Sequence, residues 1–261
     1  MQGHPMMETS QGTIFPSNMT MILNYFVFLK CHNKTSLMSL KHMEIINLGE
    51  KQSLLNQFVA ELRDVHIQQD SLRFRRNIER IGEVMAYEIS QRLHYQTRDI
   101  QTPLGIAPMA LPDKQLVIGT LFRAGIPFHQ GFLNYFDRAG SAFISAFRQY
   151  TDAEHQHFDV QIEYIASPRM EGKTLLLVDP MLATGGSMEL AYKALLTKGE
   201  PEHIHLAAII ASQQAVDYIA QRMPSERITL WVAAVDPHLN EHAYIVPGLG
   251  DAGDLAFGEK E

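Results

Sequence analysis

Residues 174–187 read TLLLVDPMLATGGS and carry the clearest structural signals of the chain. Its apolar run 175–178 is typical of a strand buried on both faces of a parallel sheet. Pro180 ends the strand because proline has no N–H to donate to a ladder. A loop with two adjacent glycines follows, and residues 188–196 have a helical pattern. Loop N–H groups and a helix N-terminus together predict an anion cradle, beside which Asp179 is placed to bind sugar hydroxyls.

The same loop is open to other interpretations. It is not a Walker phosphate loop, because G-x-x-x-x-G-K-[ST] is absent and no lysine stands at the start of the predicted helix. An ordinary strand-to-helix turn, with Ser187 as the helix cap, would use the same residues. The loop alone therefore leaves a phosphate site and a structural turn as alternatives.

Strands and helices alternate along much of the chain. Apolar stripes of period 3.6 run from Leu54 to Val65 and from Phe74 to Leu93, which predicts a pair of N-terminal helices. Strict period-2 alternation over 158–164 predicts a half-exposed strand in a protruding β-hairpin arm. The pattern as a whole predicts an α/β fold with a doubly wound, mainly parallel sheet. Further strands are predicted at 114–121, 142–147, 204–211 and 227–235, and a further helix at 131–138.

Three charged residues fall where predicted strands end. Arg123, Arg148 and Asp179 each follow an apolar strand pattern. Ligands of doubly wound sheets bind outside the carboxyl ends of the strands, so these side chains are predicted to converge on one binding site. The competing interpretation is that each arginine is an ordinary surface residue.

Two motifs together carry a family resemblance. The string DPMLATGGS at 179–187 resembles the phosphoribosyl diphosphate (PRPP) motif of the type I phosphoribosyltransferases, in the form found in uracil phosphoribosyltransferases. Residues 244–254, YIVPGLGDAGD, are similar to the C-terminal uracil-binding segment of that family. The resemblance covers residues 43–261 and implies a single domain with the type I phosphoribosyltransferase fold.

Two other motif matches near the C-terminus are rejected. Gly248-x-Gly250-x-x-Gly253 matches a dinucleotide fingerprint, but too little chain follows it for a helix, a second strand and the expected acidic residue. The segment 238–242 fits H-x-x-E-H, a zinc-protease motif that needs both histidines on one helix. Prolines at 237 and 247 crowd out such a helix.

The resemblance implies transfer of ribose 5-phosphate from PRPP to N1 of uracil, giving UMP and diphosphate. It implies Mg²⁺ held through the substrate, with no metal bound directly by the protein. Asp251 is the candidate catalytic residue, placed near PRPP to orient the reacting groups. The implied PRPP-binding residues are Arg123, Arg148, Asp179, Pro180, Met181, Leu182, Ala183, Thr184, Gly185, Gly186, Ser187 and Asp251. The implied uracil-binding residues, acting largely through the main chain, are Tyr244, Ile245, Gly250, Asp251 and Ala252.

The sequence departs from the family pattern at a few positions. Leu255 stands where the family usually has an arginine, and Glu259 where threonine is common. The usual Tyr-Arg-Asp is Phe-Arg-Gln at 147–149. Leu255 and the change at 147–149 put fine tuning or effector response in doubt more than the basic reaction.

Composition narrows the class of protein further. The chain has 261 residues, 46% hydrophobic and 20% charged, with a formal net charge of −7, which argues against a nucleic-acid partner. Its one cysteine, Cys31, excludes an intramolecular disulfide and favours a reducing, cytoplasmic compartment. The apolar run 19–29 is too short to span a membrane. We expect residues 1–42 to be a disordered or non-native extension before Met43.

Alternatives to the implied enzyme remain at this stage. A regulator that senses PRPP or UMP and binds RNA would use the same fold, and a transferase for another base would use the same cradle. The resemblance also implies a homo-oligomer, a dimer or a tetramer, with the arm exchanged between subunits. GTP activates some relatives, and the sequence leaves open whether it is an effector here.

Overall fold

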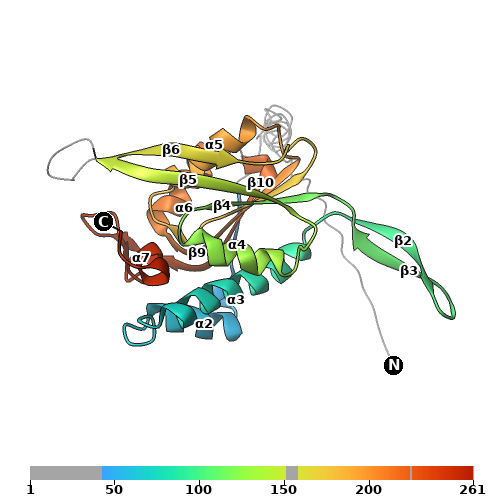
Figure 1. Cartoon of the computed structure of the whole chain (residues 1–261), viewed down its shortest axis with the longest axis horizontal. Coiled ribbons are helices and arrows are strands. Elements are labelled where there is room, and N and C mark those ends of the chain that lie inside the picture. Colours follow the sequence, from blue (N-terminus) through green and yellow to red (C-terminus); the bar gives the residue numbers. More distant parts are fainter. Residues whose placement is uncertain (1–42, 151–157, 224, 261) are drawn as a thin grey trace, which may run out of the picture. The chain divides into compact units, whose positions relative to one another are not determined.

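A mainly parallel eight-stranded sheet forms the centre of the fold (Figure 1). The computed structural model describes residues 43–150, 158–223 and 225–260, without the side chains of 146–150, 158–161 and 225. In spatial order the strands are β1 (Glu44–Asn47), β10 (Ile228–Asp236), β9 (His203–Ser212), β7 (Thr174–Val178), β4 (Leu116–Leu121), β5 (Gly140–Tyr150) and β6 (Phe158–Ala166), with β8 (Met181–Leu182) beside β9. Every pairing is parallel except that of β5 with β6, so the doubly wound α/β prediction is confirmed.

Helices cover both faces of this sheet, and each face has its own apolar core. One core joins inward residues such as Leu176 and Ile209 to three helices and to a short C-terminal helix. The other joins the alternate residues, such as Leu175 and Leu206, to two helices. Strands buried on both faces need apolar residues at every position, which is why β7 reads as a continuous hydrophobic run. The first face carries α2 (Leu54–Arg63), α3 (Ser71–Ser90) and α4 (Gly125–Leu133), and the second carries α5 (Gly186–Leu196) and α6 (Gln213–Arg222).

The predicted N-terminal helices are present, while the third predicted helix was misplaced. Residues 131–138 were expected to be helical, but α4 begins at Gly125. Pro127 lies in its first turn, where a missing N–H costs little. Glycine is unfavourable inside a helix, yet at Gly131 a Cβ would lie 2.1 Å from the backbone carbonyl oxygen of Glu79 in α3. The glycine is therefore needed for the close packing of α3 against α4.

Some elements had no counterpart in the sequence prediction. Edge strand β1 extends the sheet beside β10. A separate hairpin of β2 (Tyr95–Thr102) and β3 (Gly105–Pro112) pairs only with itself within the described residues. Strand β5 also continues further than the sequence predicts. Arg148 is predicted to follow the strand, but it lies inside β5, opposite Val160 of β6. Only the backbone of Arg148 is described, and the prediction for residues 1–42 falls outside the described residues altogether.

The C-terminal segment returns to the face of the sheet that carries α2, α3 and α4. It comprises β11 (His238–Leu239), β12 (Ile245–Val246) and α7 (Ala252–Phe257). Buried side chains of α7 belong to the same core as α2 and α3, and Figure 1 shows α7 near one end of α3. Among the described helices, none has the length and apolarity to cross a membrane.

A buried histidine adds a titratable group to the first core. The side chain of His205, in β9, accepts a hydrogen bond at Nδ1 from Trp231 Nε1 at 3.1 Å. Its Nε2 has no partner among the described residues. Burial, with the nearby charges of His203 and Arg92, lowers the pKa of His205 to about 3. The neutral imidazole is therefore the form that fits the folded protein.

We predict that this histidine makes the fold acid-sensitive. An unfolded histidine titrates near pH 6.5, so the contribution of His205 is fully present above pH 6.5 and is lost as pH falls toward about 3. The slope approaches about 1.4 kcal/mol per pH unit. In urea unfolding from pH 7 to 4, His205→Gln should lose stability less steeply than the wild type, while His66→Gln, an exposed histidine, should match the wild type. Parallel curves for His205→Gln and the wild type would contradict the prediction.

Candidate active site

The carboxyl ends of the central strands bring polar residues to one edge of the sheet. Asp179 directly follows β7, and Arg123 lies two residues past the end of β4. These strands are neighbours in parallel register, Thr120 opposite Val178. Ser212 and Asp236 are the last residues of β9 and β10. The sequence expectation that Arg123 and Asp179 follow neighbouring strands at this edge is therefore met by the backbone.

The loop 179–187 is held against β9 by its backbone. Pro180 O accepts hydrogen bonds from the N–H groups of Ile209 and Ile210, at 3.1 and 3.0 Å. Ser212 Oγ donates to Ala183 O at 2.6 Å. Asp179 Oδ1 accepts from Met181 N at 3.2 Å, which turns its carboxylate back over the loop. These contacts leave residues 184–187 as the turn into α5.

The turn into α5 depends on a glycine rather than on a side-chain cap. Gly185 is the N-cap residue with φ +86°, and no side-chain cap bond is seen there in the described structure. Ser187, the alternative cap, lies inside the first helical turn. A Cβ on Gly185 would lie 2.8 Å from Tyr218 Cδ1 of α6. The loop thus presents a helix N-terminus without a capping side chain, the arrangement that suits an anion.

Arg123 connects this edge to the C-terminal segment. Its Nη1 donates to Gly258 O at 3.0 Å, and its Nη2 forms an ion pair with Asp254 of α7. A Cβ on Gly253 would lie 3.2 Å from Arg123 Nη2, so the glycine makes room for the guanidinium. Arg123 therefore joins the end of β4 to the Gly-Asp-Ala-Gly-Asp run, 131 residues further along the chain.

The carboxylate of Asp251, which is expected near PRPP, is already bonded to groups of the C-terminal segment. Its Oδ1 caps α7 by accepting from Gly253 N at 2.8 Å and from Asp254 N at 3.0 Å. Its Oδ2 faces Lys260 Nζ at 3.3 Å. Burial acts to raise the pKa of Asp251, but the Asp254 N–H, the Lys260 ammonium and the Gly253 N–H outweigh it, so the pKa is lowered. The carboxylate is ionised and oriented before any ligand is present.

The other expected uracil-binding residues lie along one short stretch of backbone. Tyr244 pairs with Asn240 through both its N–H and its C=O, and its side chain is exposed. The side chains of Ile245 and Ala252 are buried in the first core, which fixes the backbone that carries them. Gly250 has φ +89°, a conformation that favours glycine. Apart from the exposed Tyr244 ring and the Asp251 carboxylate, this stretch therefore offers a ligand its main-chain groups.

A pair of residues that the sequence analysis did not single out supports this stretch. Arg63, the last residue of α2, binds Asp236 through two hydrogen bonds of 2.7 and 2.8 Å. Asp236 Oδ2 also accepts from Gly248 N at 2.8 Å, and Arg63 Nη1 donates to Gly248 O at 3.0 Å. The available sequence signal was Asp236-Pro237 at a strand end, because an acidic residue there follows the same pattern as Asp179-Pro180.

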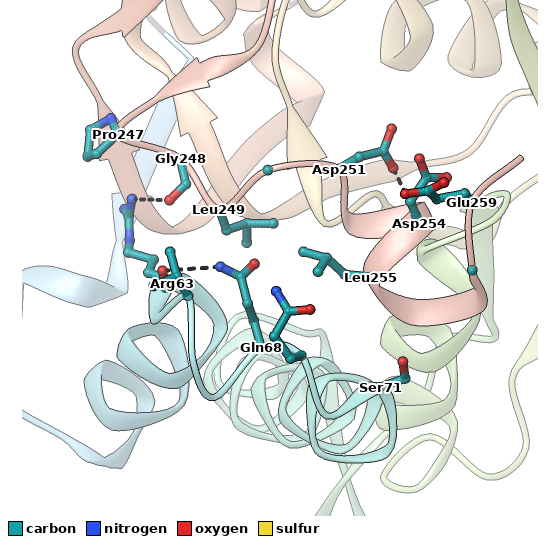
Figure 2. A pocket seen from close by; sticks show the side chains of 14 residues that line it. Arg63, Gln68, Ser71, Pro247, Gly248, Leu249, Asp251, Asp254, Leu255 and Glu259 are labelled. Atoms are coloured by element: carbon teal, nitrogen blue, oxygen red, sulfur yellow. Dashed lines mark hydrogen bonds between the residues drawn. The ribbon is translucent and has the colours of Figure 1, made fainter.

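A cavity of about 600 Å³ lies on the α2–α3 side of the stretch. Figure 2 shows Arg63 reaching Gly248 on one side of it, with Gln68 opposite Leu249 and Leu255. Its wall includes Asp251 but neither Arg123 nor the loop 179–187. Two of the departures from the family pattern, Leu255 and Glu259, thus line this cavity, and Leu255 adds an apolar side chain.

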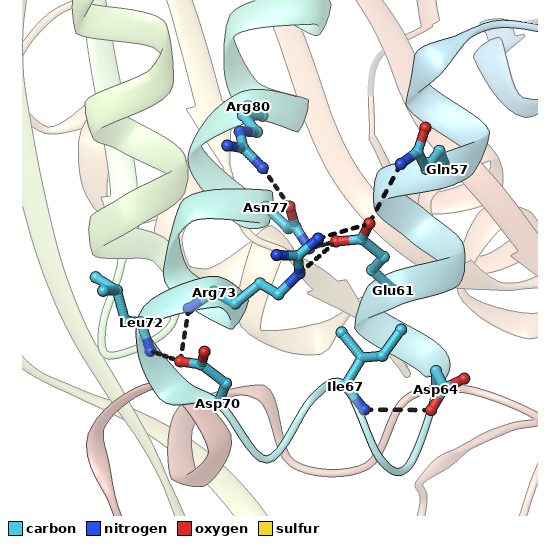
Figure 3. A network of polar contacts seen from close by, with 9 residues as sticks. All are labelled: Gln57, Glu61, Asp64, Ile67, Asp70, Leu72, Arg73, Asn77 and Arg80. Atoms are coloured by element: carbon cyan, nitrogen blue, oxygen red, sulfur yellow. Dashed lines mark hydrogen bonds and ion pairs between the residues drawn. The ribbon is translucent and has the colours of Figure 1, made fainter.

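Helices α2 and α3 are tied together by a polar network (Figure 3). The loop between them supplies Val65, Gln68 and Gln69 to the wall of the cavity. Glu61 of α2 accepts from Arg73 Nε at 2.9 Å and from Asn77 Nδ2 at 2.8 Å, both on α3. Asp70 caps α3 by accepting from its first N–H groups. The bonds from Arg73 and Asn77 lower the pKa of Glu61 to about 2. The network therefore ties α2 to α3.

The class of protein follows from this edge of the sheet. A parallel sheet that carries an acidic residue, a Thr-Gly-Gly-Ser turn into a helix and an arginine at its carboxyl edge is the arrangement of the type I phosphoribosyltransferases. The sequence model of the family described as "Uracil phosphoribosyltransferase" matches residues 50–259, and the chain belongs to that family.

Individual relatives agree with this assignment. A protein named uracil phosphoribosyltransferase from Porphyromonas gingivalis is 64% identical over 218 residues, which are 84% of this chain and 100% of that protein. One of the same name from Methanothermobacter thermautotrophicus is 38% identical over 72% of this chain and 85% of its own length. The solved structure of AQ2163 protein from Aquifex aeolicus has a TM-score of 0.73 and 26% identity, covering 82% of this chain and 98% of that one.

We predict that Asp251 stabilises α7 as its cap. Asp251→Ala should lower the free energy of unfolding by about 1 kcal/mol, because two N–H groups lose their acceptor. Asp251→Asn keeps an oxygen at Oδ1 and should cost less. Urea unfolding measures the global effect, and hydrogen exchange of the α7 amides measures the local one. Equal losses for the two variants would show that the cap is not what matters.

Proposed function

We propose that this chain transfers ribose 5-phosphate from PRPP to N1 of uracil, forming UMP and diphosphate. One observation carries the proposal: Arg123, beside the Thr-Gly-Gly-Ser edge, is bonded to Asp254 of the Gly-Asp-Ala-Gly-Asp run. Family membership and relatives named uracil phosphoribosyltransferase support the same reaction. Among the described residues, no observation favours the RNA-binding alternative.

In the proposed site the two motifs divide the substrates between them. The turn Thr184–Ser187 would hold the 5-phosphate, because its N–H groups and the N-terminus of α5 favour an anion. The Asp179 carboxylate would take the ribose hydroxyls. Arg123 and Arg148 would face the diphosphate, since guanidinium groups stay charged and offer paired donors. Residues Pro180–Ala183, which precede this turn in the same loop, would also contact PRPP.

The reaction is a displacement at the anomeric carbon of the ribose. A bond forms between uracil N1 and C1, the bond from C1 to the diphosphate oxygen breaks, and the N1 proton is released. Positive charge develops on the ribose ring and negative charge on the departing diphosphate. Preorganised cations and backbone dipoles stabilise such charges, and binding both substrates side by side supplies the orientation. In this scheme Asp251, already ionised and oriented, orients the reacting groups.

Base recognition would rest on the main chain of Ile245, Gly250 and Ala252. Uracil presents alternating donors and acceptors along one edge, and fixed N–H and C=O groups can match them. Such recognition requires a rigid backbone, which is consistent with the buried side chains of Ile245 and Ala252. The exposed ring of Tyr244 would cover the ribose or the base.

Mg²⁺ is the expected cofactor, held mainly by PRPP. Among the described residues, no three His, Cys, Asp or Glu side chains gather as a metal site. An ion held through the phosphates of its substrate needs few protein ligands, which suits the proposal that Mg²⁺ enters with PRPP. When bound, the ion would neutralise charge on the diphosphate.

The β2–β3 hairpin supports the proposal that the protein is a homo-oligomer. An isolated two-stranded hairpin is marginally stable in water. This one exposes apolar side chains, among them Leu104, Ile106 and Met109. A second copy of the chain would cover them, as a dimer or as part of a tetramer.

We assign the protein to the cytoplasm because it has a single cysteine. We assign no role to GTP.

A base panel tests the proposed function. The purified chain, incubated with PRPP, Mg²⁺ and each free base in turn, should form UMP from uracil and little nucleotide from other bases. Chromatography of the products measures this. A different nucleotide would reassign the base, and PRPP binding without any nucleotide would favour the regulator.

We predict that Arg123 binds PRPP. Arg123→Ala should raise the KM for PRPP about tenfold or more, because a charged hydrogen bond contributes ~1.5–3 kcal/mol. Asp254→Asn is the matched control, since it removes the ion pair with α7 and leaves the guanidinium in place. Steady-state kinetics separates the two roles. If Asp254→Asn raised the KM as much as Arg123→Ala, the arginine would be a brace for α7 rather than a ligand.

A further inference from the structure

The Arg63–Asp236 pair encloses both polar backbone groups of Gly248. Asp236 Oδ2 accepts from its N–H, and Arg63 Nη1 donates to its C=O. The two side chains also bind each other through paired hydrogen bonds of 2.7 and 2.8 Å. Gly248 is thus held by two hydrogen bonds, and the two side chains that make them are joined to each other by two more. Arg63 and Asp236 come from elements that are distant in the sequence.

Gly248 is a position that needs such support. It has φ +56°, and a Cβ there would lie 2.1 Å from Ile245 O. The loop therefore folds back on the residue whose main chain is expected to read the base. Gly250 and Asp251 follow immediately, so a rotation at Gly248 would move all of the expected main-chain contacts together.

Burial makes the pair strong enough to set this geometry. The Asp236 side chain is 6% exposed and that of Arg63 is 24% exposed. Buried ion pairs with satisfied hydrogen bonds are costly to break, because either partner left alone is an uncompensated charge. The bidentate geometry of arginine on a carboxylate also fixes direction, which a lysine cannot do.

We propose that Arg63 and Asp236 are positioning residues for base recognition: together they hold Gly248 so that the backbone from Ile245 to Ala252 presents its donors and acceptors to uracil. The inference rests on the proposed function and extends it to residues outside both motifs. It predicts that loss of either residue damages the handling of uracil while PRPP binding persists. A purely structural role would instead lower the active fraction, and so reduce kcat without changing either KM.

The variants are Asp236→Asn, Arg63→Lys and their combination. Each single variant should raise the KM for uracil about tenfold, the loss expected for a charge-assisted hydrogen bond. The KM for PRPP should stay within about twofold, and cytosine should become a better competitor relative to uracil. The double variant should be little worse than either single one, because the two side chains act as a unit. Arg63→Lys keeps the charge at a partly exposed position, so it covers the case in which Asp236→Asn does not fold.

Glu61→Gln is the matched control. It removes a different ion pair of α2, with Arg73, and does not touch Gly248. It should lower thermal stability and leave the KM for uracil unchanged. A rise in that KM equal to the rise in Arg63→Lys would mean that general loosening of α2 is the cause, which overturns the inference.

The same assay separates this inference from the proposed function. A wild-type chain that forms no UMP would overturn both. An active wild type whose Asp236→Asn and Arg63→Lys variants keep a normal KM for uracil would overturn the inference alone. Raised KM values for uracil in both variants, with normal values for PRPP and in Glu61→Gln, would support it.

Discussion

The parallel register of the buried strands determines where the polar residues of this protein can gather. Because β10, β9, β7 and β4 run in one direction, their carboxyl ends meet at one edge. Each of these strands ends at or just before a polar residue of the site: Arg123 beyond β4, Asp179 after β7, Ser212 on β9 and Asp236 on β10. Covering both faces with helices keeps the strands apolar, so polar groups are confined to their ends.

The sequence was informative where one segment determines its own structure. Strand β7, its acidic end and the glycine loop could be predicted because all of their signals lie within fourteen residues. Helix α4 was misplaced because Gly125, Pro127 and Gly131 resemble breakers when their tertiary neighbours are unknown. Hairpin β2–β3 was missed because its exposed strands lack a clear hydrophobic period.

The candidate site was predictable to a similar extent. Both motif segments were found, but the pairing of Arg63 with Asp236 joins residues 173 positions apart, and no local pattern encodes it. Asp251 shows a different limit. The family resemblance suggested a role beside PRPP, whereas the contacts of the Asp251 carboxylate are first with the N–H groups of its own helix. A carboxylate that caps a helix is also one that is held still, so the structural contact and the proposed role are compatible.

The pairing of β1 with β10 has a consequence for synthesis on the ribosome. Glu44 lies beside Thr229, so the first of the described strands pairs with a strand that is synthesised 185 residues later (229 − 44). At roughly 5–20 residues per second, that interval is about ten to forty seconds. Strands β4, β5 and β7 can pair well before then. Until β10 is made, β1 therefore stays unpaired, although α2 can already pack against α3, and in this period chaperones would have most to protect.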